Sequence, residues 1–293
     1  MKRAGSAMTT MFTVLSQRCR RFVAWSAVLV VVLVTVRPAS GQVAVTSGWR
    51  TERSATPGET YQGAITLHNA TDTTQMVTLS LADYGFDAAG SSSFGAPGSN
   101  VRSNASWITL SQQAVSVPPQ GTQVVGYTVI VPAGASADMY ILGAPAGIVP
   151  SGGTYWSVVL VEGEDRSPAP ADPSEFTITP KIRYAVQLVT HVGQTGECQL
   201  AFGAPRVQTG TMQVDITGAG TRACRPNLKL EVYNSDGALQ QATTLRGSYL
   251  YPGTSFRQKF DMAPLTPGAY SFLLLADVGA DRLQGARFQV QVK

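Results

Sequence analysis

The chain has 293 residues, of which 14% are charged, and its 22 Lys and Arg against 18 Asp and Glu give a formal net charge of +4. Residues 1–41 hold six of those bases and none of the acids, so the rest of the chain has 16 bases, 18 acids and a formal charge of −2. The composition therefore argues against a basic surface for nucleic acid or for an anionic membrane, and no Lys/Arg cluster elsewhere indicates one.

An export signal is the first predicted element. Basic residues precede the apolar run of residues 22–36, and small residues lie one and three positions before a cut between Gly41 and Gln42. This arrangement is typical of a secretory signal peptide, so we expect residues 1–41 to be removed and the rest to be exported. The alternative is an uncleaved membrane anchor, for which the apolar run is short.

Strands follow at regular intervals from Val43. Alternation of apolar and polar residues, with turn residues between the segments, predicts seven strands at residues 43–48, 59–69, 75–84, 106–111, 122–132, 153–162 and 181–190. Seven such strands favour one β-sandwich. We expect the Gly/Ser-rich residues 83–106 to be irregular and to lie over the sheet edge. The apolar residues 139–153 are expected to form a self-packed loop or an exposed patch for a partner.

A second series of strands is predicted after Gly196. The same alternation gives residues 198–207, 210–218, 227–234, 238–246, 254–262, 269–278 and 286–293. Asn234–Gly237 has the sequence of a hairpin turn. Leu265–Tyr270 has the spacing of a tyrosine corner, which marks an immunoglobulin-like sandwich, and Gly153–Tyr155 occupies the comparable place in the first half. The predicted fold is all-β, with two tandem immunoglobulin-like β-sandwiches at residues 42–193 and 194–293.

The cysteines predict a disulfide bond. Cys19 leaves with the export signal, whereas Cys198 and Cys224 remain as an even pair in an exported protein. We therefore expect a structural disulfide between these two. Two sulfurs alone make a poor metal site, and neither His68 nor His191 has a ligand spacing to them. No metal or other cofactor is expected.

Catalytic patterns are not found in the sequence, which has two histidines and neither a nucleophile elbow nor a phosphate-binding glycine loop. We expect His68 to make a hydrogen bond at a turn and His191 to be an exposed polar residue at a strand end. Asp277–Asp281 is interpreted as a turn and not as a calcium loop. Trp107 and Trp156 are expected to anchor the first core, with a binding surface as the alternative for either. The protein is therefore predicted not to be an enzyme.

The predicted strand at residues 181–190 raises a question about binding. An apolar row runs along one face of it, at Ile182, Tyr184, Val186 and Leu188. A Pro-rich connection, residues 165–180, precedes the strand and is far longer than a tight hairpin needs. If the strand lies at a sheet edge, the row is a binding surface, and if the strand is central, the row is core.

Residues 105–193 carry a family resemblance at the level of motifs. The segment GTYWSVVLVEGE, a Pro-rich connection and then KIRYAVQLVTHVG is similar to the last two strands of the first domain in periplasmic pilus chaperones of the PapD type, which have a second immunoglobulin-like domain directly after. The order W-I-T-L, V-P-P-Q-G-T, V-x-Y-x-V-x-V-P and G-T-Y-W is also similar to exported bacterial domains of the DUF916 and COG1470 kind. Some of those domains are thought to bind peptidoglycan or other surface components.

The resemblance implies an exported, periplasmic chaperone-like protein that assists the assembly of pilus or surface-fibre subunits. In such chaperones the final strand of the first domain completes the sheet of an immature subunit by strand addition, and two basic residues hold the subunit's terminal carboxylate. Carried over to this chain, the implied partner-binding residues are Ile182, Arg183, Tyr184, Val186, Leu188 and Arg50, with Arg53 as the alternative to Arg50. The alternative function is a structural or adhesive cell-envelope module that binds peptidoglycan or another surface component.

Overall fold

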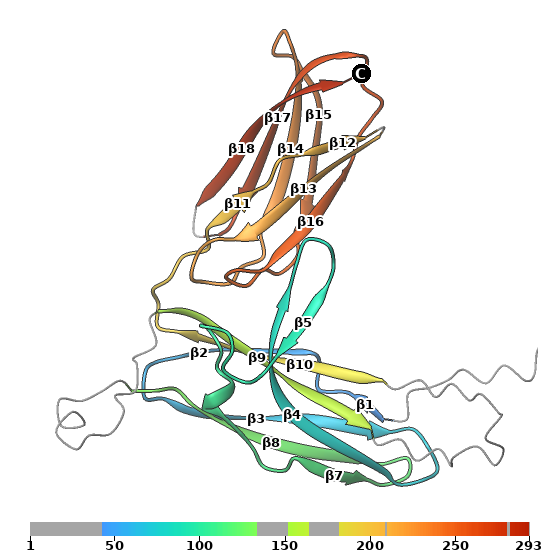
Figure 1. Cartoon of the computed structure of the whole chain (residues 1–293), viewed down its shortest axis with the longest axis vertical. Helices are drawn as coiled ribbons and strands as arrows, with labels where there is room; N and C mark the ends of the chain where they lie inside the picture. The colour runs from blue at the N-terminus through green and yellow to red at the C-terminus, as the bar shows by residue number, and fades with distance from the viewer. Residues whose placement is uncertain (1–42, 134–151, 164–181, 209, 280–281, 293) are drawn as a thin grey trace, which may run out of the picture. The chain divides into compact units, whose positions relative to one another are not determined.

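The computed structural model describes residues 43–133, 152–163, 182–208, 210–279 and 282–292 (Figure 1). These residues form strands and one short 3-10 helix, so the prediction of an all-β protein with two tandem immunoglobulin-like sandwiches is confirmed. No helix in the described ranges is long and apolar enough to cross a membrane. The predicted export signal, most of the 139–153 excursion and the Pro-rich connection lie outside the described residues.

The first sandwich consists of two sheets that face each other across one core. The first sheet has the order β1-β3-β8-β6, and the second has the order β2-β10-β9-β4, with β5 and β7 both paired to β4. The strands are β1 (Val43–Val45), β2 (Arg50–Ala55), β3 (Thr60–Asn69), β4 (Gln75–Phe86), β5 (Ser92–Gly95), β6 (Ile108–Leu110), β7 (Ala114–Val117), β8 (Thr122–Ile130), β9 (Gly153–Gly163) and β10 (Arg183–Val192).

The chain changes sheet between its first two strands. β1 pairs antiparallel with β3, whereas β2 pairs parallel with β10 in the other sheet. Gly48, between them, has a φ of 92°, a backbone conformation that glycine adopts without steric cost. The sequence did not predict β2, because its RTERSA segment has five exposed residues out of six and hence no apolar alternation. This strand matters because it borders β10.

Alternate residues of the two sheets build the first core. Leu67 and Val129 from one sheet and Leu79 and Val159 from the other are at most 1% exposed. Trp107 packs against this core and lies 4.7 Å from the ring of Tyr155, centroid to centroid, as expected of a core anchor. The prediction for Trp156 was wrong, because its side chain lies on the opposite face of the sheet and belongs to a separate cluster.

The second sandwich has its own core. One sheet is β11-β13-β12 with β16 also paired to β13, and the other is β15-β14-β17-β18. Its strands are β11 (Leu200–Phe202), β12 (Arg206–Gln208), β13 (Thr211–Gly218), β14 (Asn227–Asn234), β15 (Leu239–Arg246), β16 (Ser255–Asp261), β17 (Gly268–Asp277) and β18 (Leu283–Val292). The alternating apolar residues Met212, Val214 and Ile216 of β13 face Leu228, Leu230 and Phe272 of the other sheet, and all are at most 1% exposed.

Several local predictions for this sandwich are confirmed. The Tyr270 hydroxyl donates to the carbonyl oxygen of Thr266 at 3.0 Å, which is the tyrosine corner. The Asn234 side chain accepts hydrogen bonds from the backbone N–H groups of Asp236 and Ala238 in the turn between β14 and β15. Cys198 and Cys224 form the expected disulfide.

The stretch expected to be irregular, residues 83–106, is more ordered than predicted. β4 extends to Phe86 and forms a hairpin with β5, and a 3-10 helix covers Ala105–Trp107. Asp83 explains the order between them: its carboxylate, 4% exposed, accepts hydrogen bonds from backbone N–H groups and from serine hydroxyls. The donors are Gly98, Ser99, Asn100 and Ser103. One buried carboxylate thus organises a Gly/Ser-rich loop whose composition alone indicates no structure.

Candidate functional site

Strand β10 lies between two neighbours over most of its length. It pairs antiparallel with β9 from Arg183 to Val192, and parallel with β2 from Gln187 to Val192. The second half of the strand is therefore central in its sheet. This answers the question that the sequence left open for that half, where the apolar row is core.

The first half of β10 has a partner on one side only within the described chain. The pairing with β2 starts at Gln187, whose backbone N–H donates to the carbonyl oxygen of Trp49 at 2.8 Å. Because backbone groups alternate in direction along a strand, the N–H and C=O groups of Arg183 and Ala185 point to the same side as those of Gln187. No described strand pairs with them there. Residues 183–186 therefore present an open edge, which we call the β10 open edge.

Two exposed apolar side chains lie at this edge. Ile182, directly before β10, is 44% exposed, and Trp49, directly before β2, is 74% exposed. Because they flank unpaired backbone groups, these side chains can contact a strand that is added at this edge. Sequence reasoning identified Ile182 but missed Trp49, because a lone Trp after a glycine turn carries no periodic signal and tryptophan is more often buried.

The structure divides the predicted apolar row into two parts. Val186 and Leu188 are each 2% exposed and belong to the first core, and Tyr184 packs partly buried against it. Only Ile182 leaves the core. Partner binding by this row stays a prediction, and among its members Ile182 and the outer part of Tyr184 are the accessible candidates.

Arg183 and Arg50, the two basic residues implied to hold a client's terminal carboxylate, do not lie close together. Arg183 forms an ion pair with Glu162, its cross-strand neighbour on β9. Arg50 forms an ion pair with Glu52 at 2.6 Å, and its guanidinium lies 3.9 Å from the ring centroid of Tyr249. Arg50 is in register with Gln187, four positions from Arg183, so about 13 Å of strand separates them.

Arg53, the alternative to Arg50, is also engaged. Its guanidinium lies 5.2 Å from the ring centroid of Tyr61, within the range of a cation–π interaction. Arg53 lies in register with Thr190, further along β10 from Arg183 than Arg50 is. Neither pairing therefore forms a two-cation clamp in this structure, and the prediction that these residues hold a carboxylate stays untested.

Beyond the open edge, the face of β10 opposite to the apolar row contacts the second sandwich. The Tyr251 hydroxyl donates to the side-chain carbonyl of Gln187 at 2.6 Å, and its ring stacks on Trp156 at 4.7 Å and 12°. Burial raises the pKa of the Tyr251 phenol, and Tyr249 adds to the rise, so this hydroxyl stays protonated and able to donate. Trp156 is 1% exposed here, which excludes it as an accessible binding surface in this arrangement.

His191 is part of this junction and is not the exposed strand terminus that the sequence predicted. Its side chain is 13% exposed, its Nδ1 lies 2.9 Å from Thr154 Oγ1, and its Nε2 lies 3.4 Å from Glu52 Oε2. Thr154 Oγ1 also accepts the backbone N–H of Ala223 at 2.8 Å. Burial lowers the pKa of His191 and Arg222 adds to this, while Glu52 opposes it. The prediction was wrong because the His191 side chain is held by Thr154 on β9 and Glu52 on β2, contacts between segments far apart in the chain for which the sequence has no local signal.

His68 makes a long hydrogen bond to Thr122 Oγ1, at 3.5 Å, on the neighbouring strand β8. Within the described ranges, no group of three or more His, Cys, Asp or Glu side chains is placed to hold a metal ion. The unpaired backbone groups of Arg183 and Ala185 and the exposed side chains of Ile182 and Trp49 offer backbone pairing and apolar contact at the β10 open edge.

Solved structures of pilus chaperones are similar to this chain in fold. The class 5 fimbrial chaperone CfaA is 10% identical with a TM-score of 0.44, and the match covers 86% of this chain and 99% of that one. A chain of the CsuC–CsuE chaperone–tip adhesion subunit complex of Acinetobacter baumannii is 12% identical with a TM-score of 0.40, covering 76% and 91%. The CupB2 chaperone of Pseudomonas aeruginosa is 12% identical with a TM-score of 0.35, covering 85% and 100%. No protein-family model and no curated protein matches the chain.

Proposed function

We propose that the protein is a non-enzymatic, exported chaperone-like protein that assists the assembly of pilus or surface-fibre subunits by β-strand addition at the β10 open edge. The observation that carries the proposal is the one-sided pairing of residues 183–186, next to two exposed apolar side chains. The resemblance of residues 105–193 to the strands of pilus chaperones supports the same function.

Strand addition needs a row of unpaired backbone donors and acceptors. The outward N–H and C=O groups of Arg183 and Ala185 supply such a row, and a client strand that pairs with them would extend the sheet that already contains β9 and β4. Backbone pairing gives affinity with little dependence on the client's sequence. A chaperone that serves several related subunits requires this property.

Apolar contact supplies the second part of the interaction. Ile182 and Trp49 flank the β10 open edge at its two ends, so a client side chain placed beside either of them would bury apolar surface. Burying one such side chain contributes on the order of 1.5–3 kcal/mol. Arg183 pairs with Glu162 at about half exposure, which leaves its guanidinium accessible to a client carboxylate.

Capture of clients in the native compartment tests the proposal. Affinity-tagged protein is expected to co-purify with surface-fibre subunits, and Ala185→Pro is expected to reduce the yield at least about tenfold, because proline removes the outward backbone donor and keeps the inward pairing to β9. Ile182→Asp and Trp49→Ala should also reduce it. Val124→Asp is the matched control, since Val124 is 54% exposed on β8 of the other sheet.

The outcome that contradicts strand addition is clear. Folded Ala185→Pro, Ile182→Asp and Trp49→Ala proteins that all capture subunits as well as the unchanged protein would show that this edge is not used. Folding is checked by circular dichroism and by the Cys198–Cys224 disulfide in non-reducing peptide maps.

A further inference from the structure

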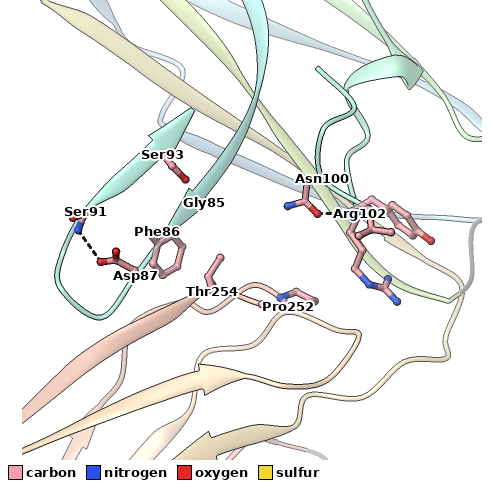
Figure 2. Close-up of a pocket in the computed structure, with 12 residues that line it drawn as sticks. Gly85, Phe86, Asp87, Ser91, Ser93, Asn100, Arg102, Pro252 and Thr254 are labelled. Atoms are coloured by element: carbon pink, nitrogen blue, oxygen red, sulfur yellow. Dashed lines mark hydrogen bonds between the residues drawn. The ribbon is translucent and has the colours of Figure 1, made fainter. Parts of the chain in front are cut away.

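A cavity lies away from the β10 open edge and has no part in the proposed strand addition. It has a volume of about 640 Å³, within the range of small-molecule sites in proteins. Three segments wall it: the β4–β5 hairpin, the loop that Asp83 organises, and the turn at residues 252–254. Figure 2 shows the hairpin on one side, Asn100 and Arg102 on the other, and Pro252 and Thr254 beneath.

Hydrogen bonds hold each wall in place. The hairpin turn is closed by Asp87, whose Oδ1 accepts the backbone N–H groups of Ala89 and Ser91 at 2.8 and 3.1 Å. The backbone N–H of Ala88 donates to Ser255 Oγ at 2.9 Å, which ties the hairpin to the strand after the 252–254 turn. Thr254 in turn bonds the backbone N–H and C=O of Tyr251. The cavity is therefore preformed, which lowers the entropic cost of binding.

The lining combines apolar rings with polar groups of both kinds. Phe86 and Tyr155 contribute aromatic rings, and Gly85 exposes backbone beside Ser93. Asn100 Oδ1 accepts the backbone N–H of Arg102 at 2.9 Å, which leaves the Asn100 amide N–H groups as donors toward the cavity. Asp87 Oδ1 accepts the hydrogen bonds of the hairpin turn, and the carboxylate has a second oxygen, Oδ2, that can accept from a ligand.

The charges at the cavity select against an ionic ligand. One carboxylate, Asp87, and one guanidinium, Arg102, line it. A ligand with a single charge would be attracted by one of these groups and repelled by the other, whereas a neutral ligand with hydroxyl groups can donate to Asp87 and accept from Asn100 or Ser93. Apolar C–H faces of such a ligand would pack on Phe86, which lines the cavity and is only partly buried. Hydroxyls around an otherwise apolar ring are the chemistry of a neutral sugar.

We propose that this cavity binds a neutral saccharide unit of a glycan chain. The site is independent of the proposed strand addition and would let the protein hold a glycan and a protein subunit together. Sugar binding at this cavity is not expected to depend on Trp156 or Trp107. Trp156 is covered by Tyr251 and Trp107 packs on Tyr155, so neither tryptophan offers a free face.

An array of neutral, acidic and amino oligosaccharides, probed with the purified full-length protein, tests the proposal, and calorimetry then measures each bound sugar. We expect neutral oligosaccharides to bind and Ser93→Phe to weaken binding at least about tenfold by filling the cavity. Ser235→Phe is the matched control, because Ser235 is exposed in the turn between β14 and β15 and does not line the cavity. Asp87→Asn keeps the Oδ1 hydrogen bonds and removes the charge, so it should weaken binding without changing the hairpin.

Three results would each overturn the proposal: no neutral sugar bound on the array, binding of charged sugars alone, or normal binding by a folded Ser93→Phe protein. If Ser93→Phe fails to fold, Asp87→Asn decides the matter, and unchanged affinity in that variant counts against the site. Ile182→Asp should bind sugars normally even where it loses subunit capture, so the failure of one function is distinguishable from the failure of the other.

Discussion

The two halves of β10 have the same residue pattern and different surroundings. Among the described strands, residues 183–186 pair with β9 alone, whereas Gln187–Val192 pair with both β9 and β2 and carry the contacts to the second sandwich. The apolar row that runs through both halves is exposed at Ile182 and buried at Leu188. Alternation of side chains thus shows that a segment is a strand, but it does not show where its apolar row leaves the core: Val186 is 2% exposed although its pairing with β2 has not yet begun, and Ile182 is 44% exposed.

The largest expected effect contrasts these two ends directly. Leu188→Asp buries a charge in the first core and should destabilise the protein by more than about 4 kcal/mol, so we expect no cooperative unfolding transition for the first sandwich. Ile182→Asp, on the exposed end, should change the free energy of unfolding by less than about 0.5 kcal/mol. Thermal and urea unfolding measure both. A native-like Leu188→Asp protein would show that the second half of β10 is not core.

The disulfide gives the next largest effect, on the turn that contacts the doubly paired half. Cys224 follows Ala223, whose N–H donates to Thr154 beside His191. Cys198 and Cys224 are 26 residues apart, for which the loop-closure estimate is about 3.5 kcal/mol. In Cys198→Ala/Cys224→Ala, faster hydrogen exchange is expected at Ala223 and Thr154 and not at Val186, whose N–H faces β9 in the singly paired half. Uniform loss of hydrogen-exchange protection along β10 would contradict this expectation, because it would show that the disulfide stabilises both halves of the strand equally.

How far the sequence predicted this arrangement depends on the kind of residue concerned. Fourteen strands were predicted from alternation, and the tyrosine corner and disulfide followed from short local patterns such as the spacing of Tyr270 and the pairing of Cys198 with Cys224. β2 was missed because a charged edge segment is held by backbone pairing to β10 and not by apolar burial. The cavity was missed for a related reason: its walls depend on Asp83, which collects donors spread over residues 98–103.

The candidate site was predictable only in part. The sequence selected the strand and Ile182, but it could not separate Ile182 from Leu188, because both belong to one alternating row. The position of Trp49 results from the start of the pairing between β2 and β10, a contact between segments far apart in the chain. Such register is a property of the folded sheet, and a single sequence does not contain a local signal for it.

A smaller effect on stability is expected at Gln187, where the doubly paired half of β10 begins. Tyr251→Phe keeps the ring stack on Trp156 and removes the hydrogen bond to Gln187, which should cost about 1 kcal/mol. A double-mutant cycle with Gln187→Ala isolates this interaction, and urea unfolding measures each member. A coupling energy near zero would contradict a specific contact between the sandwiches at Gln187.

The smallest expected effect is a dependence on pH at the end of the doubly paired half. Burial lowers the pKa of His191, with Arg222 adding to the decrease and Glu52 opposing it, so the folded state favours the neutral ring relative to the unfolded chain. Stability from this group is therefore present above the unfolded pKa of about 6.5 and is lost as the pH falls below it. A neutral Nε2–H tautomer fits the geometry, because Nδ1 can then accept from Thr154 while Nε2 donates to Glu52.

NMR titration in a His68→Gln background, where one imidazole remains, should give a His191 pKa below about 6.5. His191→Gln should remove this part of the acid sensitivity and leave hydrogen exchange at residues 183–186 unchanged. A His191 pKa above the unfolded value would contradict this account, because it would show that the Glu52 contact outweighs burial and that acid stabilises the junction.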